Sequence, residues 1–476
     1  MKRNIIIDEN ERQVEFTNDD IGVLIEYESR IFRLINPKME NYVHELFNCG
    51  LMDELIDLKL FVNSWIAQDV ACKGYNLIVE HQKIEHWNYP YEWSFNMLKD
   101  ASLTVLEANK ICNKYGYELF DVHSFNVAFN FSTPQYVDLG SIVKMDEKNG
   151  KSWSGYLIFK DYFYMPLYLF TKGFSSLPQA MPLLNGEFEP YDLFKLRYKY
   201  LSFFGNSFQK LIFKGYYNFR RLSITRHFKL EGRLGQHKYY KYILFTKKTF
   251  QNIFTIKRAN RQINKLKKAT FDTYWDNYHT DFDFESDKRV NRIVEIINDY
   301  CPDATTIVEV ASNQGKIATH ILKHTHIEKI IATDYDKNAI NKLYLDVKKS
   351  NNTLPLVYDF LRPSGKVGLP TIENRIKSDL TIGLAVTHHF LLSQNMSLKD
   401  ILKKFKKITN KYIIIEFMPL GLYGGDDKLI PPTPSYYTTE WFRNAFEVEF
   451  SLILDEKLEK NRHVFVGEIK DKDNAN

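Results

Sequence analysis

Three consecutive predicted strands in the second half of the chain end in an acidic residue. TIVEV ends near Glu309, KIIATD ends in Asp334 with Asp336 two residues later, and LPLVYD ends in Asp359. A carboxylate at the end of the second strand can accept hydrogen bonds from both hydroxyls of a ribose, and one after the third strand lies at the height of an adenine amino group. Packing alone does not explain this pattern, so it predicts a nucleoside-binding site.

The turn after the first of these strands is built from small residues. In TIVEVASNQGKIATHIL the chain passes from Glu309 into a predicted helix, and the turn contains Ala311, Ser312, Asn313 and Gly315. Small side chains let the backbone approach a ligand closely, and ligands of open α/β sheets bind at the strand ends. We therefore expect this turn and the strand-end acids to surround one ligand.

Alternating strands and helices must bring these residues together. A helix at about 288–300 precedes the first strand, helices ending near His324 and Ser350 separate the three strands, and DLTIGLAV and KYIIIEF read as two further strands. This alternation predicts parallel βαβ units in an α/β, Rossmann-like doubly wound sheet. The final segments EFSLILDEKL and RHVFVGEI predict a terminal antiparallel hairpin at the sheet edge.

Residues 270–470 resemble a class I S-adenosylmethionine-dependent methyltransferase. E-V-A-S-N-Q-G is similar to the family's D-x-G-x-N-x-G loop, and IIATDYDKNAINKLY to its ribose-binding strand and the helix that follows. One departure is Ala311 at the first glycine position, which tightens the turn. The resemblance implies that S-adenosyl-L-methionine is the cofactor. It also implies that the cofactor is bound by Glu309, Ala311, Ser312, Asn313, Gly315, Asp334, Asp336 and Asp359.

The alternative for this half of the chain is a dinucleotide-binding Rossmann domain, as in a dehydrogenase, or an inactive descendant of a methyltransferase. The G-x-G-x-x-G fingerprint of dinucleotide binding is absent from the turn. The predicted terminal hairpin also suits a methyltransferase better. Both observations favour the methyltransferase.

Two histidines follow the predicted strand in GLAVTHHF, at the edge that faces the acceptor in the family it resembles. A neutral imidazole there could take a proton from a hydroxyl during methyl transfer, so we expect one of His388 and His389, preferably His388, to be a base, although a histidine beside a strand can equally be structural. Glu416, at the end of IIIEF, is a second candidate, and we expect Tyr278 with His279 to close over the cofactor. Because transfer from a sulfonium is already downhill, positioning can supply much of the catalysis.

A second group of chemically suggestive residues lies in ELFDVHSFNVAFNFSTPQYVDLGS, residues 118–141. Asp121 and Asn126 have a D-x4-N spacing, and Asp138 begins an Asp-Leu-Gly after a predicted hairpin that would hold it near Asn126. This segment resembles the catalytic region of the protein-kinase fold, in which the first Asp is the base and the Asn and second Asp bind magnesium. The resemblance implies an N-terminal α+β kinase-like domain that binds Mg-ATP, with Asn126 and Asp138 as the Mg²⁺ ligands.

The kinase-like pattern is incomplete. Leu119 stands where a kinase has its catalytic-loop histidine, the first 60 residues contain no recognisable glycine-rich phosphate loop, and Arg33 is the basic residue on the strand where a kinase lysine would lie. Without these parts little remains to orient ATP. An active kinase and a lobe that binds an acceptor or nucleotide without chemistry both stay open.

Positive charge is concentrated at residues 206–270, which hold 17 Lys or Arg and a single acid, Glu231. Within this stretch QNIFTIKRANRQINKLKKA has apolar residues at helical spacing and basic residues between them, which predicts a basic amphipathic helix. Such a segment could bind an anionic membrane surface, a lipid-linked phosphate or nucleic acid, or could be a solvated helical face. No nucleic-acid-binding module is recognisable, so we favour the membrane surface.

The whole chain reads as a multidomain enzyme of 476 residues: a kinase-like domain at 20–235, a basic helical linker at 236–270 and a methyltransferase domain at 271–472. Four scattered cysteines, with no signal sequence and no long apolar stretch, predict a cytoplasmic protein, peripheral at the inner membrane surface if the basic segment binds lipid.

Three further segments, YPYEWSFNMLKDASL, LAVTHHF and IIIEFMP, together with the D-x4-N and D-L-G pair resemble a group of bacterial methyltransferases related to nodulation proteins and surface-glycan modification. This resemblance spans most of the chain and implies O-methylation of a glycan or lipid-linked sugar. Two alternatives remain. One is a bifunctional enzyme that both phosphorylates and methylates the acceptor, and the other is a non-catalytic two-lobe scaffold.

Overall fold

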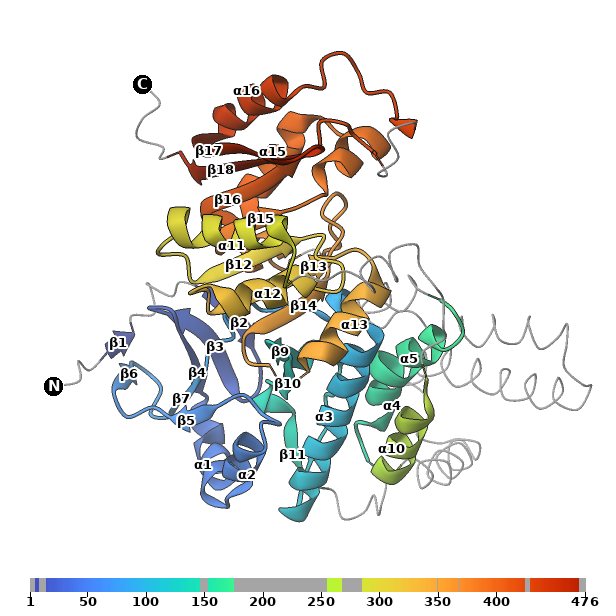
Figure 1. The fold of residues 1–476 in the computed structure, drawn as a ribbon. Coiled ribbons are helices and arrows are strands. Elements are labelled where there is room, and N and C mark those ends of the chain that lie inside the picture. The colour runs from blue at the N-terminus through green and yellow to red at the C-terminus, as the bar shows by residue number, and fades with distance from the viewer. Residues whose placement is uncertain are drawn as a thin grey trace, which may run out of the picture. The chain divides into compact units, whose positions relative to one another are not determined.

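A computed structural model describes residues 5–7, 14–145, 153–174, 255–267, 285–348, 350–366, 368–423 and 429–470 of the chain. The chain divides into two compact units, whose elements are labelled in Figure 1. The first unit comprises Met1–Gln82, Ala101–Val127 and Tyr136–Ala269, and the second comprises Lys83–Asp100, Ala128–Gln135 and Thr270–Asn476. Among the described residues, no helix combines the length and the apolar character needed to cross a membrane.

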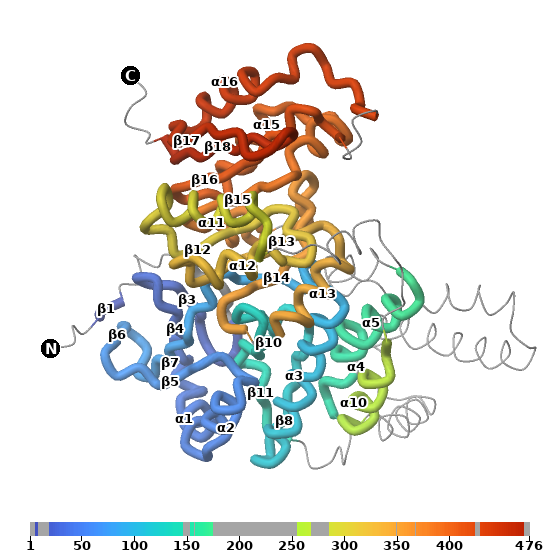
Figure 2. Tube along the Cα trace, in the orientation of Figure 1, coloured from blue at the N-terminus to red at the C-terminus, as the bar shows by residue number. Residues whose placement is uncertain are grey.

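The first unit contains an antiparallel sheet of five strands in the order β2-β3-β4-β7-β5. These strands are β2 (Val14–Asn18), β3 (Gly22–Tyr27), β4 (Arg30–Ile35), β5 (Ser64–Ile66) and β7 (Ile78–His81). Alternate side chains of β3 and β4, such as Ile25, Phe32 and Leu34, are fully buried and form a hydrophobic core. A small parallel pair, β1 (Ile5–Ile7) with β6 (Val70–Cys72), packs against the same core (Figure 2). Helices α1 (Glu40–Asn48) and α2 (Leu51–Asp57) follow β4.

The long helix α3 (Phe95–Lys114) leads into β8 (Tyr117–Leu119), which pairs antiparallel with β11 (Ile142–Lys144). Between them, β9 (Val127–Asn130) and β10 (Thr133–Tyr136) pair with each other, as the sequence predicted. A single helical turn at Leu139–Ser141 follows Asp138. Helices α4 (Tyr156–Phe159), α5 (Met165–Phe170) and α10 (Ile256–Lys265) are also described in this part of the chain.

The second unit is built on a seven-stranded sheet in the order β14-β13-β12-β15-β16-β18-β17 (Figure 1). The strands are β12 (Thr306–Val310), β13 (Lys329–Asp334), β14 (Thr353–Val357), β15 (Ser378–Gly383), β16 (Thr409–Phe417), β17 (Phe450–Glu459) and β18 (Arg462–Ile469). The first five are parallel, whereas β18 runs antiparallel between β16 and β17. The predicted Rossmann-like sheet and terminal hairpin are confirmed.

Helices connect the parallel strands of the second unit, so the interior of its sheet is covered on both faces. They are α11 (Lys288–Tyr300), α12 (Lys316–His324), α13 (Lys337–Val347), α14 (Ile372–Arg375), α15 (Leu398–Ile408) and α16 (Thr439–Glu449). Consecutive side chains of β16, Ile413 to Ile415, are fully buried. The five parallel strands all end at one edge of the sheet, where the strand order reverses between β12 and β15 and where ligands of such sheets bind.

Two segments from the first third of the sequence belong to the second unit, namely residues 83–100 and 128–135. Glu92 and Arg375 form a buried ion pair with a 3.0 Å contact from Nη1 to Oε2. The same Arg375 nitrogen donates to the carbonyl oxygen of Trp87 at 2.5 Å. The compact unit around the Rossmann-like sheet therefore includes residues outside the predicted 271–472 range.

Candidate functional site

The turn between β12 and α12 contains three residues with a left-handed backbone: Ala311 (φ 59°), Asn313 (φ 51°) and Gly315 (φ 64°). The Ser312 amide donates to the Thr333 carbonyl at 2.9 Å, and the Gly315 amide donates to the Ser312 carbonyl at 2.8 Å. A left-handed alanine costs about 1–2 kcal/mol, and strain of this kind is concentrated at ligand sites. This turn leads directly into the N-terminal end of α12. The backbone amides at that end of the helix can bind a polar group at the strand ends.

Gly315 lies where this turn meets α12 and leaves no room for a side chain. A Cβ atom built there would lie 2.6 Å from Leu343 Cδ1 on α13. The positive φ of Gly315 disfavours other residues independently of this contact. Glycine at this position therefore sets how closely the start of α12 packs against α13.

Asp334 at the end of β13 fixes the turn from the neighbouring strand. Its buried carboxylate accepts the Asn313 amide at Oδ2 and the Asp336 amide at Oδ1, both at 2.8 Å. Burial raises the pKa of Asp334 to about 6, although both hydrogen bonds oppose the rise. The backbone of Tyr335 also hydrogen-bonds to this carboxylate, and because a carboxylate has about four lone-pair sites, capacity remains for a ribose hydroxyl. Asp336 caps α13, because its Oδ1 accepts the amides of Asn338 (2.7 Å) and Ala339 (3.3 Å).

Glu309 lies on β12, one residue before the strand ends, and is only 3% exposed. Burial, reinforced by the nearby charge of Asp334, raises the pKa of Glu309 to about 8, so its carboxyl is protonated at neutral pH. Its Oε2 has no hydrogen-bond partner in the described part of the chain. Because an unpaired buried polar atom costs roughly 1–3 kcal/mol, this oxygen fits a site that a polar ligand completes.

Two further residues, Asp359 and Tyr335, follow strands at the same edge of the sheet. Asp359 follows β14, is exposed, and accepts the amides of Leu361 and Arg362 at Oδ1, both at 3.0 Å. Tyr335, which the sequence analysis missed, follows Asp334 directly and is 59% exposed. Its position could have been noticed in the sequence, because it is an aromatic residue immediately after the expected ribose-binding acid. An exposed aromatic ring can stack on an adenine.

His388 and His389 follow β15 at the same edge of the sheet, and their ring centroids lie 4.1 Å apart. Burial, together with the charges of His389 and Arg462, lowers the pKa of His388 to about 3, and burial also lowers the pKa of His389. His388 Nδ1 is buried and has no partner among the described residues. The His388 ring is therefore neutral at pH 7 with an unpaired nitrogen, which suits a hydrogen-bond acceptor more than a strong base.

Glu416 is fully buried on β16 and is already bound by three groups. Arg289 Nη1 lies 3.2 Å from both of its carboxylate oxygens, and Arg462 Nη1 lies 3.0 Å from Oε2. The amide of Ala385, a left-handed residue after β15, donates to Oε2 at 2.9 Å. The Thr387 hydroxyl donates to the backbone carbonyl of Glu416 at 2.6 Å. In this arrangement Glu416 positions the segment that carries the histidines.

The sequence analysis singled out neither arginine, although the position of Arg289 in a predicted helix could have indicated it. It lies on the apolar face of α11, one turn before Ile293 and two turns before Ile296, and all three residues are buried. A charged residue in an apolar helical stripe is rarely buried without a partner. Sequence alone does not say that this partner lies on β16.

In the first unit, the structure brings Asn126 and Asp138 together as predicted. Asn126 Nδ2 lies 3.3 Å from Asp138 Oδ2 and 2.8 Å from the Asp121 carbonyl. Ser141 donates its hydroxyl to Asp138 Oδ2, and the Gly140 amide donates to Oδ1 at 3.0 Å. The Asp121 carboxylate has a different neighbour, His123 Nε2 at 3.6 Å.

The positive charge nearest Asp138 comes from Arg33, which the sequence analysis placed on the strand of a kinase lysine. Arg33 is almost fully buried on β4, with Nη2 3.4 Å from Asp138 Oδ1 and Nη1 2.7 Å from Asp19 Oδ2. The side chains of Asn126 and Asp138 therefore lie together, and their role as Mg²⁺ ligands stays a prediction.

Most of the predicted basic segment 206–270 lies outside the described residues, as do Tyr278 and His279. The part that is described, α10, confirms a helix in this segment. The Thr255 hydroxyl accepts the Arg258 amide at 3.3 Å as a helix cap, and Ala259 and Ile263 are buried. The membrane-surface partner stays a prediction.

The chain was compared with known proteins, and no protein-family model matches it. It is 24% identical over 419 residues to the nodulation protein NoeA of Rhizobium meliloti (strain 1021), which covers 84% of this chain and 83% of that protein. Similar solved structures include the N-methyltransferase NodS of Bradyrhizobium japonicum WM9 in complex with S-adenosyl-l-homocysteine (TM-score 0.30, 10% identity, 43% of this chain and 94% of that one). Another is the magnesium protoporphyrin IX methyltransferase of Synechocystis PCC 6803 (TM-score 0.28, 10% identity, 47% of this chain and 100% of that one). At these TM-scores the fold of the second unit rests on its own strand order.

Proposed function

We propose that the second unit is an S-adenosylmethionine-dependent methyltransferase. The observation that carries this proposal is the contact between the strained turn after β12 and Asp334, beside the buried and unpaired oxygen of Glu309. The antiparallel insertion of β18 between β16 and β17 supports it, because a dinucleotide-binding sheet has the order 3-2-1-4-5-6. This insertion counts against the dehydrogenase alternative.

The residues at the strand ends fit this cofactor. Asp334 retains acceptor capacity for a ribose hydroxyl, and Glu309, protonated at neutral pH, can donate one hydrogen bond. Tyr335 and Asp359 follow β13 and β14, on the side where we expect the adenine. When bound, the cofactor supplies a methyl group on a positively charged sulfur. The contribution of the chain is to hold this group in line with the acceptor and to exclude water.

The acceptor group that we propose is a hydroxyl, oriented by His388. The unpaired Nδ1 of this residue can accept a hydrogen bond from such a hydroxyl and take its proton as the new carbon–oxygen bond forms. A pKa of about 3 makes His388 a weak base, so orientation is its larger role. Glu416 supports it by holding the Ala385 amide. A glycan or lipid-linked sugar as the source of the hydroxyl stays a prediction of the sequence analysis.

Calorimetric titration of the full-length chain with S-adenosylhomocysteine tests the cofactor site. We expect one bound equivalent for the wild type and no detectable binding for Asp334→Ala. Asp299→Asn, which changes an exposed acid on α11, should bind like the wild type. A wild-type chain that fails to bind refutes the proposal. Labelled S-adenosylmethionine incubated with host lipid and polysaccharide fractions, with and without ATP, then identifies the acceptor, and a methylated product excludes the scaffold alternative.

For the first unit we propose a protein-kinase-like fold that does not transfer phosphate. An antiparallel five-stranded sheet, a long helix and then the Asn126–Asp138 pair occur in the order that a kinase requires. Arg33 reaches Asp138 from the third strand of the sheet, where a kinase has its lysine, and brings a positive charge to this carboxylate. Such a lobe would bind an acceptor or a nucleotide for the methyltransferase.

Measurements of Mg-ATP binding and turnover by the full-length chain distinguish a lobe that does not transfer phosphate from the bifunctional enzyme. We expect no ATP turnover by the wild type. Turnover that disappears in Asp121→Asn, with binding that disappears in Asp138→Asn, would instead establish the bifunctional kinase and methyltransferase. Asp20→Asn, which changes an exposed acid beside Asp19, is the matched control.

A further inference from the structure

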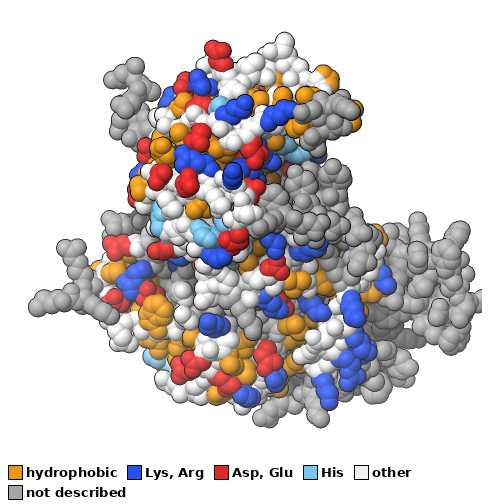
Figure 3. All heavy atoms as spheres, in the orientation of Figure 1, with side chains coloured by type: hydrophobic (Ala, Val, Ile, Leu, Met, Phe, Trp, Pro, Cys, Tyr) orange, Lys and Arg blue, Asp and Glu red, His pale blue; other side chains and the backbone are white. Residues whose placement is uncertain are grey.

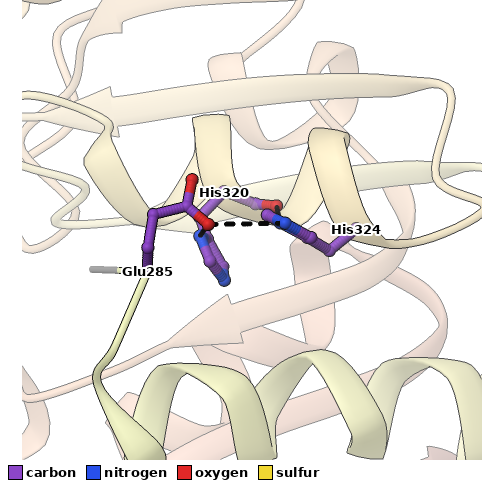
Figure 4. Close-up of side chains that lie close together, drawn as sticks. All are labelled: Glu285, His320 and His324. Atoms are coloured by element: carbon purple, nitrogen blue, oxygen red, sulfur yellow. Dashed lines mark hydrogen bonds and ion pairs between the residues drawn. The ribbon is translucent and has the colours of Figure 1, made fainter.

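Glu285, His320 and His324 gather on the surface of the second unit, and none of them has a role in the proposed methyl transfer. Glu285 precedes α11, whereas the two histidines lie one turn apart on α12 and share one side of that helix (Figure 4). One ligand atom from each residue lies within 4.8 Å of the other two. Figure 3 shows imidazole side chains at the surface over α12, beside acidic and basic side chains. Three potential metal ligands therefore converge from two elements.

Hydrogen bonds set which nitrogen of each ring faces Glu285. His320 Nε2 lies 3.1 Å from Asn291 Oδ1, which only accepts, so Nε2 carries the proton and Nδ1 keeps its lone pair. His324 Nδ1 lies 2.9 Å from the His320 carbonyl and donates to it, which leaves the lone pair on Nε2. These two lone-pair nitrogens are the ones nearest Glu285 Oε2, at 4.0 Å and 3.5 Å respectively. Metal-ligating histidines are oriented in this way by a second hydrogen bond.

The carboxylate of Glu285 is held in place beside the two rings. The ring centroids of His320 and His324 lie 4.2 Å apart. Lys323 Nζ binds Glu285 at Oε1, 2.5 Å away, which leaves Oε2 directed toward the histidines. Imidazole nitrogens and a carboxylate oxygen are ligand atoms that transition metals accept.

The spacing of the three atoms is close to that of a tetrahedral zinc site. Bonds of about 2.0–2.2 Å place neighbouring ligand atoms roughly 3.3–3.5 Å apart. The His320 side chain is 4% exposed and held by Asn291, whereas the side chains of His324 and Glu285 are 34% and 58% exposed. The two exposed side chains can therefore close the remaining gap onto a fixed one. Two imidazoles with one carboxylate favour zinc or a related transition metal over magnesium or calcium, which prefer oxygen ligands.

We propose that Glu285, His320 and His324 form a transition-metal site that takes Zn²⁺, with a fourth position open to solvent. A bound ion would join the residue that precedes α11 to α12. Helix α12 begins directly after Gly315, the last residue of the turn after β12, so the ion would also brace the helix that follows the cofactor site. This inference does not depend on methyl transfer, because its ligands lie outside the residues assigned to that reaction.

Titration of the metal-free, full-length chain with Zn²⁺ tests this site. Isothermal calorimetry should find one bound equivalent in the wild type, and Co²⁺ in its place should give the visible absorption of a tetrahedral nitrogen and oxygen site. His324→Ala and Glu285→Gln change exposed groups and should each weaken Zn²⁺ binding more than tenfold. His44→Ala, which removes an exposed histidine on α1, should leave the affinity unchanged.

Thermal unfolding provides the second measurement. Zn²⁺ should raise the unfolding temperature of the wild type and of His44→Ala, and should leave that of His324→Ala unchanged, because a ligand stabilises only the folded state to which it binds. Failure of the wild type to bind Zn²⁺ stoichiometrically would overturn the proposal. Equal affinity in the wild type, His324→Ala and Glu285→Gln would also overturn it, since the ion would then be bound elsewhere.

Discussion

Replacing Glu309 by Gln would test the charge state of the strand end beside the cofactor turn. In the folded protein the pKa of Glu309 is raised from 4.5 to about 8, chiefly by burial. Between these two values the folded state binds more protons than the unfolded state, so the free energy of unfolding falls as the pH rises. The contribution of the protonated carboxyl is complete below pH 4.5 and is lost as the pH rises through 8.

A comparison of the wild type with Glu309→Gln between pH 6.5 and 8 isolates this carboxyl, because the other shifted groups titrate alike in both proteins. These groups include Lys337, whose pKa burial lowers to about 8, and His388, whose pKa burial lowers from 6.5 to about 3; both make the folded state more stable as the pH rises through this interval. Over this interval the folded-state pKa of about 8 predicts a loss of about 1.6 kcal/mol. For a unit of roughly 200 residues that loss corresponds to a fall of about 3–6 °C in unfolding temperature.

Scanning calorimetry of the full-length chain at pH 6.5 and pH 8 is the assay, applied to the transition that S-adenosylhomocysteine moves upward. From pH 6.5 to pH 8 the unfolding temperature of the wild type should fall by about 3–6 °C relative to that of Glu309→Gln, whereas Glu295→Gln, a change at an exposed glutamate on α11, should follow the wild type. Cofactor affinity at pH 7 should change little, because the amide is neutral like the protonated acid. An equal fall in Glu309→Gln and the wild type would refute the reasoning.

Further predictions concern the packing of the second unit. Arg289→Ala should lower its free energy of unfolding by about 3–5 kcal/mol, because Glu416 stays buried with one partner fewer; a loss below about 1 kcal/mol in chemical denaturation would contradict this. Ala311→Gly should raise the free energy of unfolding by about 1 kcal/mol, because glycine adopts a φ of 59° without strain; an unchanged or lower midpoint would count against it. A fragment starting at residue 271 should not unfold cooperatively, because Arg375 loses Glu92; a sharp calorimetric transition would show otherwise.

The elements of the second unit were predictable because each of them is a local pattern. Apolar runs such as IIATD and YIIIEF mark strands buried on both faces, and amphipathic spacing marks the helices between them. The terminal hairpin was also predictable, from two consecutive strand patterns. The position of β18 between β16 and β17 depends on which strands pair with each other. The hydrophobic periodicity of the sequence does not specify this pairing.

The chemistry of the site was predictable by residue type but not by partner. Glu309 and Asp334 were expected to contact a ligand, yet no local pattern indicates that Asp334 binds the Asn313 amide or that its charge helps burial to raise the pKa of Glu309. Glu416 was a candidate base, and its two arginine partners come from α11 and β18. A buried charge is stabilised by the residues that contact it in the folded protein, and these residues are far from it in the sequence.

The domain boundaries were even harder to predict from local sequence patterns. Local composition separates residues 20–235 from 271–472, but the contacts give residues 83–100 and 128–135 to the second unit. Asn126 and Asp138 both belong to the first unit, while most of the hairpin that joins them belongs to the second. The chain therefore passes from the first unit to the second and back again between these two residues, and a cut at one linker cannot separate two intact units.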